Sequence, residues 1–280
     1  MFLGQALRAA IERLAAASVP SPRMNAELLL MFTLSRDRAY LYGHPEYELT
    51  SDEQLRYEEA LAERSQGIPA QYITGHQEFW GMDLVVNPAV LIPRPETEHV
   101  VEAVINRVGS GFWPGKIVDV GTGSGCIALA LAKELPRAQI YATEISPAAL
   151  EIARANAARH QLNARIRFHA ADLVEGLEGG SFDFVVSNPP YVGESEQESV
   201  QLEVRRFEPR GAVFAGPEGT EVIERLIPQA RQVLAPGGWL VIEISGTISG
   251  RVRELLSGWA QVEIKSDLQG IPRVASARKP

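Results

Sequence analysis

The sequence is poor in the residues that build disulfide-linked or metal-held scaffolds. Its 280 residues include a single cysteine, Cys126, and five histidines that show no pairing at metal-ligand spacing. One cysteine cannot form a disulfide within the chain, and it cannot supply a metal site that needs several cysteine ligands. We therefore expect neither an intrachain disulfide nor a bound metal.

The sequence also lacks long hydrophobic runs and a positive charge balance. No apolar stretch approaches the roughly 20 residues that a membrane-spanning helix needs. Arg8 and Glu12 interrupt the apolar positions near the N-terminus, where a signal peptide would need an unbroken block. The formal charge of −8 disfavours broad binding to the nucleic-acid backbone. We expect a cytoplasmic protein with no membrane association and no stable nucleic-acid binding.

The composition, 45% hydrophobic and 22% charged, indicates a globular chain with one large domain and a smaller one. Residues 1–70 predict the smaller domain, which is helical. Apolar residues recur at helical spacing in residues 2–14 and again in residues 24–34. Thr50 and Glu53 match a capping box at the start of a third helix. This domain contains no catalytic pattern, so both structural packing and recognition of a macromolecular partner remain open roles.

Residues 71–92 are expected to form a β-hairpin linker, because two extended-looking runs flank Gly81. Pro95 can occupy the first turn of the helix that follows. Arg94 lies between Pro93 and Pro95 in an extended segment. Its simplest expected role is an exposed ion pair.

Residues 93–280 alternate strands with helices after a glycine-rich link at residues 109–115. We expect strands at 116–120, 139–143, 165–169, 182–187 and 239–244, helices at 126–135, from 146 onward and at 220–234, and a turn at 236–238. This alternation predicts an α/β domain whose parallel sheet carries helices on both faces. Ligands of such sheets bind at the carboxyl ends of the strands, where the strand order reverses.

Polar residues follow several of these strands and are expected to meet at one edge of the sheet. They are Asp119 with the loop behind it, Glu144, Asp172 and Asn188. The loop consists of Gly121, Thr122, Gly123, Ser124 and Gly125. Its glycines let the backbone approach a ligand, and the helix behind it supplies N–H groups, while Glu144 can accept two hydrogen bonds from a ribose diol. A dinucleotide-binding fingerprint is a competing interpretation, but Cys126 stands where that motif needs a small residue and Gly125 comes one position early.

The strand at 182–187 runs into Asn188, Pro189, Pro190 and Tyr191, which we predict to hold a planar –NH2 group. Neither proline has a backbone N–H, so the turn offers carbonyl acceptors with few competing donors. The side-chain oxygen of Asn188 and the carbonyl of Pro189 can each accept one amide hydrogen, while the ring of Tyr191 covers the flat face of the group. An ordinary exit from strand to loop is the alternative.

Together these motifs resemble the HemK/PrmC family of release factor glutamine methyltransferases. The resemblance covers the whole chain and rests on residues 69–75, 78–80, 91–98, 187–191 and 207–210. It implies a class I, Rossmann-like methyltransferase sheet and S-adenosyl-L-methionine as the cofactor. The implied reaction is methylation of the side-chain amide nitrogen (N5) of the glutamine in the Gly-Gly-Gln motif of class I peptide chain release factors.

The resemblance also implies a role for each matching residue. Cofactor contacts would come from Gly121, Thr122, Gly123, Ser124, Gly125, Glu144, Asp172, Leu173 and Asn188. The glutamine would be held by Asn188, Pro189, Pro190 and Tyr191, with Asn188, Pro189 and Tyr191 as the catalytic residues. The chain departs from the family pattern at Glu144, where aspartate is commoner, at Leu173, where an aromatic often covers the adenine, and at Ser245, where glycine is usual.

The chemistry of such a reaction can be argued from the residues themselves. An amide nitrogen is a weak nucleophile, and no arrangement of Cys, Ser or His suggests covalent catalysis. Two oxygens that hold the –NH2 hydrogens would aim the nitrogen and favour its developing positive charge. One alternative is a nucleic-acid amino-methyltransferase that acts on adenine or cytosine of a flipped base, which the acidic balance disfavours. Another is an adaptor that binds release factors or the ribosome, which leaves the cofactor residues without a purpose.

Overall fold

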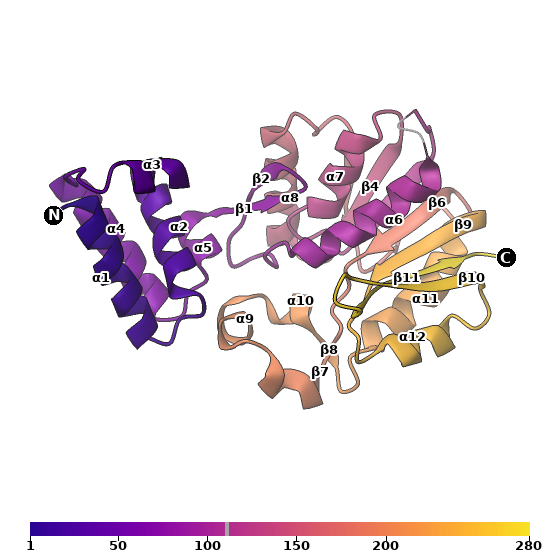
Figure 1. Cartoon of the computed structure of the whole chain (residues 1–280). Coiled ribbons are helices and arrows are strands. Elements are labelled where there is room, and N and C mark those ends of the chain that lie inside the picture. Colours follow the sequence, from indigo (N-terminus) through magenta and orange to yellow (C-terminus); the bar gives the residue numbers. More distant parts are fainter. Residues whose placement is uncertain (110–111) are drawn as a thin grey trace. The chain divides into compact units, whose positions relative to one another are not determined.

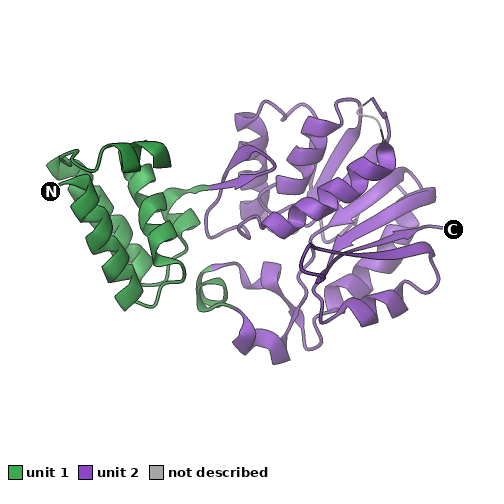
Figure 2. Ribbon diagram, viewed as in Figure 1, with its two compact units in different colours: residues 1–76, 201–207 green, residues 77–200, 208–280 purple. Residues whose placement is uncertain are grey.

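The computed structural model describes residues 1–109 and 112–280, which form two compact units (Figure 2). The helical unit comprises residues 1–76 and 201–207, and the sheet unit comprises residues 77–200 and 208–280. Residues 110 and 111 of the glycine-rich link predicted at 109–115 lie outside the described residues.

The helical unit is built from short amphipathic helices around a core of its own. Its helices are α1 (Leu3–Ala16), α2 (Pro22–Leu34), α3 (Arg38–Gly43), α4 (Ser51–Ser65), α5 (Ala70–Thr74) and α9 (Leu202–Phe207). The predicted capping box is confirmed at α4, where Thr50 Oγ1 accepts a hydrogen bond from the N–H of Glu53 at 3.2 Å and Glu53 Oε2 accepts one from the N–H of Thr50 at 2.8 Å. Helix α2 begins two residues earlier than predicted because Pro22 suits the first helical position.

Helix α9 belongs to the helical unit although it is distant in sequence. The buried guanidinium of Arg64 donates to Glu203 Oε2 at 2.6 Å, to Asn25 Oδ1 at 2.7 Å and to the carbonyl of Ile68 at 3.1 Å. These three acceptors satisfy a charge that would be costly to bury alone. The sequence pattern gave no sign of this link, because Arg64 and Glu203 are 139 positions apart.

The hairpin linker is shorter than predicted. Strand β1 (His76–Phe79) pairs with β2 (Met82–Val85), and Trp80 and Gly81 both have positive φ in the turn between them. The expectation that the hairpin starts at residue 71 is wrong over its first residues, because α5 (Ala70–Thr74) occupies them. The N–H groups that follow Pro69 bond back to its carbonyl, and this local helix replaces the strand.

The sheet unit contains a seven-stranded sheet in the order β10-β11-β9-β6-β3-β4-β5 (Figure 1). Its strands are β3 (Lys116–Val120), β4 (Gln139–Glu144), β5 (Ile166–Ala170), β6 (Phe182–Ser187), β9 (Leu234–Glu243), β10 (Ala260–Ser266) and β11 (Pro272–Arg278). The five strands from β5 to β9 are parallel, whereas β11 and β10 add antiparallel pairs that were not predicted. The predicted turn at 236–238 is wrong, because β9 runs through it and a register shift opposite Phe182 absorbs the irregular residues.

Helices cover both faces of this sheet, as predicted for an α/β fold. They are α6 (Glu98–Val108), α7 (Cys126–Glu134), α8 (Pro147–Arg159), α11 (Glu221–Val233) and α12 (Ser249–Leu255). The sheet unit also contains η1 (Pro95–Thr97), η2 (Glu194–Ser199) and α10 (Arg210–Val213), together with the short strands β7 (Val192–Gly193) and β8 (Phe214–Gly216), which pair with each other. In β6, Phe184 and Val186 pack in the core that contains α6 and α7, whereas Val185 packs in the core that contains α11 and α12. Both faces are therefore apolar, and polar groups gather at the strand ends.

Candidate functional site

A cavity of about 520 Å³, here called the rim cavity, lies at the carboxyl ends of β3, β4 and β6. This volume is within the usual range for small-molecule sites. The predicted site residues that line it are Gly121, Thr122, Gly123, Ser124, Glu144, Asp172, Leu173, Asn188, Pro189 and Pro190. Other lining residues were not singled out as cofactor or substrate contacts from the sequence, among them Val90, Leu91, Pro93, Thr97, Cys126, Ile145, Pro209, Gly211, Ala212, Val222 and Arg225.

Two predicted site residues, Gly125 and Tyr191, are not among those that line the rim cavity. Gly125 has a φ of +87°, and a Cβ at this position would lie 2.6 Å from Leu129 Cδ1, so this glycine lets helix α7 start directly behind the loop. Tyr191 packs against the core that contains α11 and α12, and its hydroxyl donates to Glu243 Oε1 at 3.1 Å. Both residues thus support the cavity from outside its wall.

The loop after β3 is held by hydrogen bonds from below. The N–H groups of Gly121 and Thr122 both donate to the carbonyl of Thr143 on β4, at 2.9 and 3.0 Å. Asp119, fully buried under the loop, accepts from the hydroxyl of Thr122 at 2.6 Å and from the N–H of Ala128 at 3.2 Å. Burial raises the pKa of Asp119 to about 7, although these two hydrogen bonds oppose the rise. Asp119 is therefore a support for the loop and not a wall of the cavity.

Glu144 connects the loop to the end of β4. Its Oε2 accepts from the N–H of Gly123 at 3.0 Å, and its Oε1 accepts from the N–H of Ser146 at 2.9 Å. Each carboxylate oxygen has capacity for a further hydrogen bond. Because Glu144 also lines the cavity, it can order the loop and accept from a ligand at the same time.

Asp172 and Leu173 follow β5 and reach the same cavity. Asp172 forms an ion pair with Arg225 of α11, which is another lining residue. Leu173 has a φ of +53°, a left-handed conformation that is uncommon for a residue with a Cβ. Its side chain packs against the core that contains α11, so it gives the cavity an apolar wall.

Asn188 lines the cavity with its amide in a defined orientation. Its Nδ2 donates to Thr97 Oγ1 at 3.0 Å. The residue before it, Ser187, donates its hydroxyl to the carbonyl of Val120 at 2.7 Å, which ties the end of β6 to the end of β3. The side-chain oxygen of Asn188 is therefore the end of its amide that is left for a ligand.

Glu243, at the end of β9, is buried and accepts a hydrogen bond from the hydroxyl of Tyr191, three residues after Asn188. Burial raises its pKa to about 7, and the nearby carboxylate of Glu96 acts in the same direction. Hydrogen bonds from the hydroxyls of Thr97 and Tyr191 and the charge of Arg273 oppose the rise. The sequence prediction did not include Glu243 or Thr97 among the site residues, although Thr97 lies within the motif at residues 91–98.

The role of Arg94, which the sequence left open, follows from its partner. Arg94 forms an ion pair with Glu208, whose carboxylate is buried and also accepts from the N–H of Ile92 at 3.1 Å. The expected ion pair is therefore present, but its acidic partner is not on the surface. This pair connects residues 89–93 to residues 209–212, and both segments contribute lining residues to the rim cavity.

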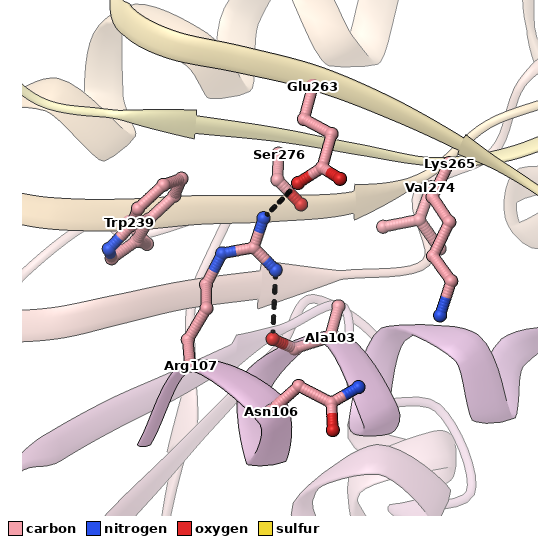
Figure 3. Close-up of a pocket in the computed structure, with 8 residues that line it drawn as sticks. All are labelled: Ala103, Asn106, Arg107, Trp239, Glu263, Lys265, Val274 and Ser276. Carbon is pink, nitrogen blue, oxygen red and sulfur yellow. Dashed lines mark hydrogen bonds and ion pairs between the residues drawn. The ribbon is translucent and has the colours of Figure 1, made fainter. Parts of the chain in front are cut away.

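A second cavity, of about 420 Å³, lies over the sheet between α6 and the antiparallel strands (Figure 3). Figure 3 shows Arg107 between the ring of Trp239 and the carboxylate of Glu263. Arg107 donates to Glu263 at 2.7 Å and to the carbonyl of Ala103 at 2.9 Å, and its guanidinium carbon lies 4.4 Å from the centre of the Trp239 ring. Its charged group is thus already paired within the protein, and the cavity shares no lining residue with the rim cavity.

Within residues 1–109 and 112–280, no group of three or more His, Cys, Asp and Glu side chains is arranged to hold a metal ion. In the same described ranges, no helix is both long enough and apolar enough to cross a membrane.

Comparison with protein families gives two matches that together cover most of the chain. Residues 5–75 match the PrmC N-terminal domain, and residues 98–207 match the methyltransferase small domain. The release factor glutamine methyltransferase of Koribacter versatilis is 55% identical over 100% of this chain and 99% of its own length. That of Moorella thermoacetica is 45% identical over 91% of this chain and 89% of its own length.

Solved structures with this fold are more distant in sequence. The hMettl16 catalytic domain in complex with an RNA hairpin of the MAT2A 3′UTR matches with a TM-score of 0.57 at 18% identity, over 86% of this chain and 92% of that one. The 16S rRNA N2 G1207 methyltransferase of T. thermophilus, in complex with AdoMet and guanosine, matches with a TM-score of 0.54 at 20% identity, over 73% of this chain and 50% of that one. At these identities the likeness shows the fold alone.

Proposed function

The chain belongs to the family of release factor glutamine methyltransferases, and we propose that it uses S-adenosyl-L-methionine to methylate the N5 amide nitrogen of the glutamine in the Gly-Gly-Gln motif of class I peptide chain release factors. The observation that carries this proposal is the orientation of Asn188. Its amide nitrogen is bonded to Thr97, and its oxygen is left on the wall of the rim cavity. An amide oxygen beside two prolines is suited to accept from a substrate –NH2 group.

The residues of the rim cavity fit the proposed cofactor. Glu144 offers carboxylate oxygens to a ribose diol, and Leu173 offers an apolar surface to the adenine, beside the polar group of Asp172. The glycine loop brings backbone close to the same space. When bound, the cofactor supplies a methyl group on a positively charged sulfur, which is a good leaving group.

The protein contributes positioning in this proposal. The side-chain oxygen of Asn188 and the carbonyl of Pro189 accept the two hydrogens of the substrate amide and aim its nitrogen at the methyl group. The same two oxygens stabilise the positive charge that develops on the nitrogen, which then releases one proton to water. Tyr191 does not line the cavity, so we assign it the role of fixing the turn through its bond to Glu243.

We propose that the helical unit binds the release factor outside the active site, because a single glutamine side chain offers little surface for specificity. Helix α2 leaves Met24 and Phe32 about half exposed, which suits contact with a protein partner. Deleting residues 1–70 would also remove Arg64, the partner of Glu203, so substitution is the sharper test. Met24→Glu with Phe32→Glu should raise the KM for whole release factor and leave cofactor affinity unchanged. An unchanged KM would mean that this face does not bind the substrate.

The proposed reaction is tested by offering release factor, DNA and ribosomal RNA in parallel with methyl-labelled cofactor. We expect label only on the release factor, and mass spectrometry should locate it on the glutamine of the Gly-Gly-Gln motif. A release factor with alanine in place of that glutamine is the control and should stay unlabelled. Label on nucleic acid alone would favour the amino-methyltransferase alternative. Because the proposed substrate acts in translation, we place the activity in the cytoplasm, without stable nucleic-acid binding or membrane association.

A further inference from the structure

We propose that Arg225 is a positioning residue for the adenine of the cofactor, and that it acts by fixing the carboxylate of Asp172 so that one oxygen can accept from the 6-amino group. The inference rests on the proposed function and extends it to a residue of α11 that lies outside the sequence motifs. Arg225 donates from Nη2 to Asp172 Oδ2, and both residues line the rim cavity.

The ends of β4 and β5 indicate where the adenine would lie. These strands are paired, and the N–H of Ala171 donates to the carbonyl of Glu144 at 3.0 Å. A base is joined directly to its ribose, so a ribose held by Glu144 places the base beside the residues that follow these two strands. Two of them, Ile145 and Leu173, offer apolar side chains to the cavity, and Ile145 is 68% exposed. Such side chains suit the flat faces of a base.

The polar edge of that base needs a partner of its own, and Asp172 is the carboxylate on this part of the wall. A carboxylate only accepts hydrogen bonds, and it does so through both of its oxygens. Oδ2 is directed to Arg225, which leaves Oδ1 for the 6-amino group, the only –NH2 group of adenine. A purine without this group offers no donor there, so an oriented Asp172 distinguishes adenine from such a purine.

Stability does not account for this ion pair. The side chains of Arg225 and Asp172 are 54% and 39% exposed, and ion pairs with such exposure contribute little. The next residue, Leu173, has a φ of +53°, and strain of this kind persists mainly at functional sites. Val222, three positions before Arg225 on α11, also lines the cavity, so this face of the helix is directed at the ligand space.

Arg225 is the only positively charged residue among the described residues that line the rim cavity. A direct bond to the carboxylate of the cofactor's amino acid is therefore the competing role. We favour the positioning role because the guanidinium is already directed to Asp172. The two roles differ in one measurable respect, since only the positioning role needs Asp172.

The test is titration calorimetry of the full-length protein with S-adenosyl-L-homocysteine and with its purine analogue, in which hydrogen replaces the 6-amino group. The wild type should bind the adenine ligand about 10-fold more tightly, the lower end for a hydrogen bond to a charged group, because Asp172 is partly exposed. Asp172→Ala should bind both ligands equally. Arg225→Met should reduce the ratio of the two affinities by about 2- to 5-fold, as expected for an ion pair near the surface.

The matched control is Arg251→Met. Arg251 of α12 donates to Glu224 of α11 at 3.0 Å, and the two side chains are 53% and 39% exposed. Arg251 also contacts Glu254 at 3.4 Å, so the control removes at least as much ion pairing as Arg225→Met. None of these three residues lines the rim cavity. The control should keep the wild-type ratio of affinities.

A double variant separates the two roles of Arg225. If Arg225 acts through Asp172 alone, Asp172→Ala combined with Arg225→Met should bind S-adenosyl-L-homocysteine as tightly as Asp172→Ala does. A further loss of affinity would mean that Arg225 holds the cofactor itself, and it would overturn the inference. An unchanged ratio in Arg225→Met would also overturn it, as would an equal fall in Arg251→Met or a wild type that does not distinguish the ligands.

Thermal melts confirm that each variant is folded, so a loss of fold is not mistaken for a loss of recognition. Failure of the proposed function has a different signature. A protein that distinguishes the two ligands but places no methyl group on the glutamine would refute the proposed substrate and leave the role of Arg225 intact. A wild type that binds neither ligand would refute both the proposed cofactor and this inference.

Discussion

Replacing Glu144 with glutamine tests whether one carboxylate both orders the glycine loop and holds the cofactor. In the protein, its two oxygens accept from the N–H groups of Gly123 and Ser146 at 3.0 and 2.9 Å. Glutamine has the same shape, but one of its ends donates. One of the two backbone N–H groups would therefore face another donor, and one hydroxyl of the proposed ribose would lose its charged acceptor.

The magnitude follows from separating these two losses. A hydrogen bond to a charged group contributes about 1.5–3 kcal/mol, and its loss weakens cofactor binding by about 10- to 150-fold. The unpaired backbone N–H is present with and without cofactor, so most of its cost cancels in binding. That cost of about 1–3 kcal/mol should instead lower the free energy of unfolding of the cofactor-free protein.

Titration calorimetry with S-adenosyl-L-methionine measures the first loss, and chemical denaturation without cofactor measures the second. The matched control is Glu78→Gln, because Glu78 Oε1 also accepts a backbone N–H, that of Gly81 at 2.6 Å, but Glu78 is not among the lining residues of the rim cavity. The control should lose some stability and keep its cofactor affinity.

Two outcomes would refute this reasoning. Wild-type affinity in a folded Glu144→Gln variant would mean that Glu144 does not hold the cofactor. An equal loss of affinity in Glu78→Gln would mean that the effect reflects general destabilisation and not a contact in the rim cavity.

Three further predictions concern the turn at the end of β6 and its supports. Asn188→Ala should lower turnover on the order of 10²–10³-fold while release factor still binds. The turnover of Asn188→Asp should lie between those of the wild type and Asn188→Ala. Wild-type rates of Asn188→Ala in single-turnover kinetics would show that the turn has no catalytic role. Gly219→Ala should also lower kcat, because Gly219 has a φ of +82° and an added Cβ would lie 2.7 Å from the carbonyl oxygen of Tyr191. The control Gly250→Ala has open space around the added Cβ and should keep the wild-type kcat. Finally, burial raises the pKa of Glu243 from 4.5 to about 7, so its contribution to stability is fully present below pH 4.5 and is lost as the pH rises through 7. Glu243→Gln should therefore stabilise the protein at pH 8 by up to about 3 kcal/mol and much less at pH 5, and equal shifts in thermal melts at both pH values would contradict this assignment.

Much of the framework was predictable because it depends on near neighbours in the chain. The capping box of Thr50 and Glu53 and the cap of Ser146 on α8, which accepts from the N–H of Ala149 at 3.3 Å, are interactions across three residues. The alternation of strands and helices predicted the α/β fold, and the rule for strand ends predicted a common cavity near Glu144 and Asn188. The roles of these lining residues remain predictions.

Only the tertiary structure decided how that cavity is supported. Glu208 lies 114 positions from Arg94, and Glu243 lies 52 positions from Tyr191, so no local pattern shows that they meet. The same holds for the path of β9 through residues 236–238, which depends on pairing with neighbouring strands and not on the turn preference of proline and glycine. Local sequence determines which elements form, because helices, caps and turns are made by nearby residues. The bond from Asn188 to Thr97 and the bond from Tyr191 to Glu243 join residues that are far apart in the sequence, and such bonds exist only once the elements that carry them have packed together.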